Sequence, residues 1–182
     1  MNRIRPALCA LLLTGPAALA GTFTADFATP DTSTFILNGA GTLADGNAWM
    51  PFIETNRLIL TVNQNTLSGS FSPNDFDASA PIEAFTARFK LQFGPGTANA
   101  ADGAAFSFGP SVYQYSTTYN KVGAGGAAFA VSFHTYTSNG GPAVDVYLYG
   151  NRIGHAPLVK TDMVNSQLQD VTISSTETPP SR

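Results

Sequence analysis

Three short stretches carry residue types that could recognise a ligand rich in hydroxyl groups. In chain order they are Ala101-Asp102-Gly103, the glycine loop 123–126 and the segment 131–139. They supply three kinds of contact, from Asp102, from Gly125 and Gly126, and from Asn139. One carboxylate, unobstructed backbone N–H groups and one amide side chain are what binding a sugar diol requires. The combination indicates a carbohydrate site.

Strands must hold these residues in place, and the alternation of apolar and polar residues predicts where those strands lie. Residues 84–93 alternate strictly, with an apolar face formed by Phe85, Ala87, Phe89, Leu91 and Phe93. Shorter alternating stretches are 22–27, 57–62, 129–133 and 144–148. Turn residues separate them at Asn38-Gly39, Asp45-Gly46, Ser72-Pro73-Asn74-Asp75 and Asn139-Gly140-Gly141-Pro142. Short strands that each have one apolar face predict an all-β fold, an antiparallel β-sandwich.

The N-terminal residues have the pattern of an export signal. Arg3 and Arg5 precede an apolar run and the small residues Ala18 and Ala20, which predicts a signal peptide over residues 1–20 and cleavage before Gly21. The mature protein is therefore expected to be secreted, periplasmic or on the cell surface. The apolar run is too short to span a bilayer. We expect no membrane span.

Residues 21–174 form a single predicted domain, followed by an irregular tail over residues 175–182. The only cysteine, Cys9, lies in the predicted signal, so no disulfide is expected in the mature chain. That chain has seven Lys and Arg against twelve Asp and Glu, a net charge of −5. The negative charge argues against nucleic acid as a partner. Trp49 lies among apolar neighbours and is expected in the core.

The order of the motifs resembles the legume-type (L-type) lectin domain of the concanavalin A-like lectin/glucanase superfamily, in its bacterial secreted form. Residues 57–61 with 68–71 resemble the family stretch LRLT … GSAF, residues 101–103 its ADG strand, and residues 129–139 its VAVEFDTYxN strand. The resemblance implies a concanavalin A-like jelly roll. It also implies further strands after residues 169–173, so the domain is expected to be truncated at its C-terminus.

The resemblance assigns roles to particular residues. It implies that Asp102 accepts hydrogen bonds from sugar hydroxyls, that Gly125 or Gly126 donates a backbone N–H, and that Asn139, or Ser138 one residue earlier, completes the site beside Tyr136. The alternative for Asp102 is a turn cap before a strand. The tyrosines of residues 113–119 are expected to form either a rim of the site or a sheet surface.

The metal site of the family is altered in this chain. The positions of its acidic metal ligands are occupied by Ser132, His134 and Gly141, and its metal-binding His falls near Asp145. Calcium needs six to eight oxygen ligands, several of them anionic, so we expect no cofactor and no tight calcium or manganese site. His134 and Asp145 should face each other across a hairpin as a hydrogen-bonded pair. A divalent metal held by His134, Asp145 and Ser138 is the weaker alternative.

Glycosidases share this sandwich, but they use a pair of carboxylates. The matching strand presents Ser132, His134 and Tyr136 on one face and no acidic residue. We therefore expect no enzyme. The leading hypothesis is a non-catalytic domain with glycans as partners, and the alternative is a structural or adhesive surface module that has lost sugar and metal binding.

Overall fold

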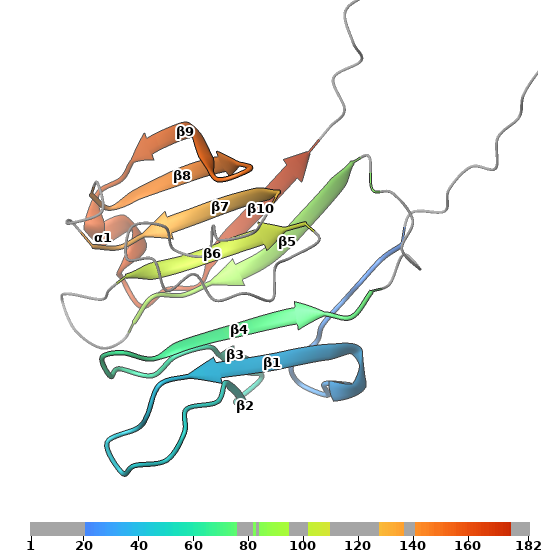
Figure 1. Cartoon of the computed structure of the whole chain (residues 1–182), viewed down its shortest axis with the longest axis vertical. Helices are drawn as coiled ribbons and strands as arrows, with labels where there is room; N and C mark the ends of the chain where they lie inside the picture. Colours follow the sequence, from blue (N-terminus) through green and yellow to red (C-terminus); the bar gives the residue numbers. More distant parts are fainter. Residues whose placement is uncertain are drawn as a thin grey trace, which may run out of the picture.

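The computed structural model describes residues 21–75, 82, 84–94, 102–109, 128–136 and 141–175. The strands in these residues are β1 (Phe35–Ala40), β2 (Phe52–Glu54), β3 (Arg57–Ile59), β4 (Ser68–Pro73), β5 (Phe85–Leu91), β6 (Gly103–Phe108), β7 (Phe129–His134), β8 (Ala143–Leu148), β9 (Asn151–Pro157) and β10 (Gln169–Ser175). Two short helices accompany them, η1 (Thr32–Thr34) and α1 (Lys160–Met163). Every strand pair is antiparallel, which confirms the all-β prediction (Figure 1). Neither helix is long and apolar enough to cross a membrane.

The main core lies between two layers. One layer is the four-stranded sheet β6-β7-β8-β9, and the other is the β5–β10 ladder (Figure 1). Val131 and Phe133 of β7 pack with Ile173 of β10 and Met163 of α1, together with the apolar face of β5. Phe85 stacks on Phe108 with ring centroids 4.7 Å apart. Alternation along each strand thus leaves the other face of the four-stranded sheet to polar residues.

Glycines let a second group of strands approach closely. β1 pairs with β4, and a Cβ on Gly39 of β1 would lie 2.2 Å from the carbonyl oxygen of Trp49. A Cβ on Gly69 of β4 would lie 2.0 Å from the carbonyl oxygen of Leu60. Both positions therefore need a residue without a side chain, because the backbone of Trp49, Met50 and Leu60 packs directly on this ladder.

Three sequence predictions of local structure were wrong. Residues 22–27 form no strand: Phe23 and Phe27 do pack on Phe71, but the backbone pairs with no strand in the described part of the chain. Asn38-Gly39 is not a turn but lies inside β1, where Gly39 serves close packing instead. Ser72 and Pro73 also belong to a strand, the end of β4.

Trp49 is buried as predicted, with 3% of its surface exposed, and its indole N–H donates to the Leu60 carbonyl oxygen at 3.1 Å. Trp49→Phe should lower the free energy of unfolding by about 1 to 2 kcal/mol, because a donor and packing volume are lost together. Chemical denaturation followed by circular dichroism measures this. Tyr149→Phe, at a side chain 76% exposed, should stay within about 0.5 kcal/mol. Equal values for the two variants would contradict the assigned role of the indole.

Candidate functional site

Asp102 and Tyr136 lie at the same edge of the four-stranded sheet. Gly103, the first residue of β6, pairs with His134, the last residue of β7. The pairing continues one residue outward, where the backbone N–H of Thr135 donates to the carbonyl oxygen of Asp102 at 3.1 Å. Asp102 and Tyr136, which are far apart in the sequence, are thereby placed at neighbouring strand ends.

Both of these side chains face solvent. Asp102 is exposed and Tyr136 is 38% exposed. Among the described residues, the Asp102 carboxylate makes no hydrogen bond or ion pair. The backbone bond to Thr135 thus holds an exposed carboxylate at the end of β6, and the partly exposed Tyr136 follows directly after Thr135 at the end of β7.

Gly103 holds this edge together by close backbone approach. Its φ is +142°, and a Cβ there would lie 2.0 Å from the carbonyl oxygen of Phe133. No larger residue fits without moving β6 away from β7. The glycine that follows Asp102 in the sequence is thus required by the packing of the two strands.

The remaining predicted sugar-site residues lie outside the described part of the chain. They are Gly125, Gly126 and Asn139, and the same holds for Ser138 and for the tyrosine segment 113–119. Their roles stay predictions.

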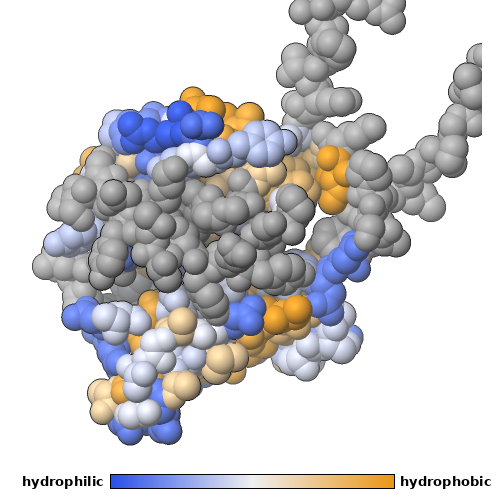
Figure 2. Space-filling view, in the orientation of Figure 1, coloured by the Kyte–Doolittle hydropathy of each residue, from blue (hydrophilic) through white to orange (hydrophobic). Residues whose placement is uncertain are grey.

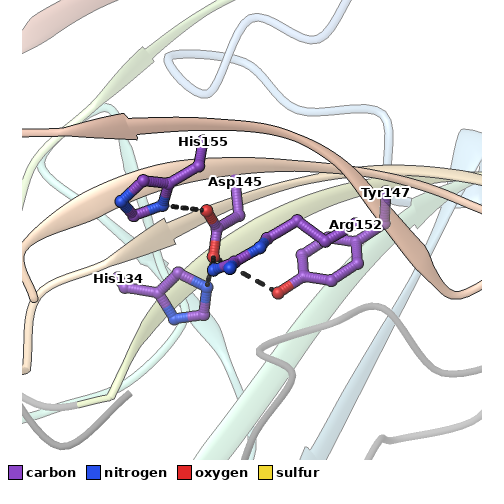
Figure 3. Close-up of polar contacts among 5 residues, drawn as sticks. All are labelled: His134, Asp145, Tyr147, Arg152 and His155. Atoms are coloured by element: carbon purple, nitrogen blue, oxygen red, sulfur yellow. Dashed lines mark hydrogen bonds and ion pairs between the residues drawn. The ribbon is translucent and has the colours of Figure 1, made fainter. Parts of the chain in front are cut away.

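A cluster of polar side chains centres on the carboxylate of Asp145, on the face of the sheet opposite the main core (Figure 3). Asp145 is 2% exposed. His155 Nδ1 lies 2.6 Å from its Oδ1, and because a carboxylate only accepts, the imidazole donates. At Oδ2 the Tyr147 hydroxyl donates at 3.3 Å, Arg152 Nη1 lies at 3.5 Å and His134 Nε2 at 3.3 Å. We call these five residues the Asp145 cluster.

An irregularity in β9 brings two of these partners to the same side. Asp145 pairs with His155, whereas Tyr147 pairs with Arg152, so Ile153 is an extra residue between the two pairs. Without this bulge, Arg152 and His155 would point to opposite faces. Sequence reasoning missed both. The sequence contains one signal for the hairpin that leads into β9, Gly150 next to Asn151. In the structure Tyr149 and Gly150 form this tight turn, with positive φ values of 47° and 76°.

Burial and charge act in opposite directions on Asp145. Burial raises its pKa, but the hydrogen bond from His155 and the charges of Arg152, His134 and His155 outweigh this, and the pKa lies below its ordinary 3.8. Burial also raises the pKa of Tyr147, as does the Asp145 charge. Asp145 is therefore ionised and Tyr147 neutral at physiological pH.

The predicted approach of His134 to Asp145 is present, but its geometry differs from a hydrogen-bonded pair. His134 Nε2 lies 3.3 Å from Asp145 Oδ2, but neither ring nitrogen of His134 makes a hydrogen bond within the described residues. The described residues also contain no group of three or more His, Cys, Asp or Glu placed to hold a metal. His134 and His155 approach different oxygens of the carboxylate, and Arg152 supplies a positive charge beside it.

Comparison with known proteins adds no further information about the family. No protein-family model matches the chain, and no curated protein matches it.

Proposed function

We propose that this chain is a secreted, non-catalytic, lectin-like domain that binds carbohydrate at the edge formed by Asp102 and Tyr136. The observation that carries the proposal is the exposed Asp102 carboxylate, which has no partner of its own among the described residues while its backbone is held by Thr135. An ionised carboxylate accepts strong hydrogen bonds from hydroxyl groups. Asn139 and the Gly125-Gly126 loop complete the site in this proposal.

Binding at such a site is expected to be weak. A shallow site formed by few side chains is consistent with a millimolar dissociation constant, about −4 kcal/mol. The Asp102 carboxylate is expected to supply a large share of this binding free energy, since hydrogen bonds to a charged group contribute about 1.5 to 3 kcal/mol each. Specificity for hydroxyl groups follows from the acceptor, and Tyr136 offers an apolar surface for one ring face.

Asp102→Ala should therefore abolish sugar binding while leaving the fold intact. Calorimetry against sugars selected on a glycan array should show affinity lowered at least about tenfold. The free energy of unfolding should change by less than about 0.5 kcal/mol, because the side chain is exposed and has no partner among the described residues. The control is Asp170→Ala, which removes another exposed carboxylate, 83% exposed, from β10 and should bind normally.

Two other results would redirect the proposal. A folded protein that binds no sugar would favour the structural or adhesive module. Polysaccharide hydrolysis that disappears in Asp102→Ala would make the chain an enzyme. Export is tested separately by N-terminal sequencing of the mature protein, which should begin at Gly21.

A further inference from the structure

The Asp145 cluster and the Asp102 edge are joined by two consecutive residues of the same strand. The side chain of His134 lies against Asp145, while its backbone pairs with Gly103. The next residue, Thr135, bonds through its N–H to Asp102. The residue that packs against Asp145 is thus the same residue whose backbone, with that of Thr135, holds the end of β7 against Asp102.

His134 is the least satisfied polar group of the described residues. It is 1% exposed, and both ring nitrogens are buried without a hydrogen-bond partner in the part of the chain described here. A neutral ring carries one N–H, one acceptor nitrogen and no charge, so leaving it without partners costs less than it does for the charged ring. A protonated ring adds a second buried N–H and a positive charge. The protonated form is thus the one that this environment disfavours.

The charged and titratable groups around His134 come from three strands. Asp145 and Tyr147 lie on β8, Arg152 and His155 on β9, and Asp102 directly before β6. Burial lowers the pKa of His134 below its ordinary 6.5, the charges of Asp145 and Asp102 raise it, and Arg152 and His155 lower it. Figure 2 shows hydrophilic residues along the β9 side of the molecule, where Arg152 is 51% exposed. Arg152 and His155, the latter 37% exposed, are the members of the cluster that reach the surface on this side.

We propose that His134 is a positioning residue that makes the Asp102 edge sensitive to acid. In the neutral state its ring keeps the end of β7 against β6. On protonation at mildly acidic pH the ring leaves its buried position, the Thr135–Asp102 bond loosens, and the ligand is released. The release of sugar rests on the proposed function, whereas the movement of the strand end does not.

The direction of the pH effect follows from the lowered pKa. Above pH 6.5 the ring is neutral in both the folded and the unfolded chain, so it adds no pH dependence. Below pH 6.5 the unfolded chain takes up a proton that the folded chain resists, so stability falls until the pH passes the folded pKa. The effect of Asp145 appears separately, at pH values below about 3.8.

The test is an NMR titration of the exported protein, without the predicted signal peptide, between pH 8 and pH 4.5. It follows the backbone amides of Thr135 and Gly103. Both should shift with one titration below pH 6.5, in step with the His134 imidazole, and hydrogen exchange of the Thr135 amide should accelerate at least tenfold. The chain has two histidines, so the variants are His134→Gln and His155→Gln. The amide titration should vanish in the first and persist in the second.

Sugar affinity, measured by calorimetry at pH 7.5 and pH 5, is the second readout. It should fall at least fivefold on acidification in the wild type and stay constant in His134→Gln. Amides that do not move, or that still titrate in His134→Gln, would overturn the proposal. If that variant does not fold, a His134 imidazole that titrates in the wild type without moving Thr135 overturns it equally. Titrating amides in a protein that binds no sugar would reject the proposed function and leave the switch in place.

Discussion

Asp145→Ala is expected to lower the free energy of unfolding by about 2 to 3 kcal/mol at pH 7. The carboxylate is 2% exposed and is the shared partner of His155, Arg152 and Tyr147. Its removal takes this acceptor from the buried Tyr147 hydroxyl and from the partly exposed His155 and Arg152, and it leaves a cavity at a buried position. Urea denaturation at pH 7, followed by circular dichroism, measures the loss.

Two further variants separate charge from packing. Asp145→Asn keeps the shape and one acceptor oxygen, so its stability should lie between the wild type and Asp145→Ala. Asp170→Ala breaks the Lys90–Asp170 pair, whose side chains are 59% and 83% exposed, and should cost less than about 1 kcal/mol. If Asp145→Ala lowers the free energy of unfolding by no more than Asp170→Ala does, the Asp145 cluster does not stabilise the sheet.

The pH dependence of the stability difference between the wild type and Asp145→Ala provides an internal check. The pKa of Asp145 is lowered in the folded protein, so the stability that it contributes is complete above the unfolded value of 3.8. This stability is lost as the pH falls through the folded pKa, because both states are then protonated. The gap between the wild type and Asp145→Ala should therefore narrow below about pH 3.8. A gap that grows on acidification would contradict the ionised carboxylate.

Local patterns predicted strands whose apolar residues face the main core. The alternation of apolar residues in β5, β7 and β8 is present in the structure, because these strands pack those residues into the main core. The pattern does not report burial, since β7 is buried on both faces and the buried positions of β8 are Ala143, Asp145 and Tyr147 on the opposite face. The same alternation failed at residues 22–27, where side chains pack on Phe71 and the described part of the chain offers no partner strand. Strand pairing depends on residues far away in the sequence.

The candidate site was predictable only where register follows from a short connection. His134 and Asp145 lie on neighbouring strands of a hairpin, so their proximity could be predicted, but they do not face each other directly. Asp145 pairs with Ser132 and His134 with Ala143, so the two side chains approach diagonally. Arg152 and His155 could not, since a bulge at Ile153 shifts every side chain beyond it to the other face. The proximity of Asp102 to Thr135 requires knowledge of the β6–β7 register, which no local signal encodes.

Gly103→Ala is expected to destabilise the domain by about 2 to 4 kcal/mol and to weaken the proposed sugar binding more than tenfold. The new Cβ would lie 2.0 Å from the Phe133 carbonyl oxygen and 3.2 Å from the His134 Cα, both backbone atoms that cannot rotate away. A φ of +142° adds strain for any residue with a side chain. Relief requires β6 and β7 to separate at this end, which displaces Asp102.

Gly46→Ala is the matched control for this prediction. Gly46 also has a positive φ, +87°, but a Cβ there meets no atom within 4 Å, so only the backbone strain of about 1 kcal/mol applies. Denaturation of both variants, with calorimetry and the Thr135 amide shift as local readouts, separates strain from steric overlap. Because the overlap alone opens the strand end, only Gly103→Ala should move the Thr135 amide. Equal losses in the two variants would mean that β6 tolerates a side chain at this position, and the rigid presentation of Asp102 would then have no structural basis.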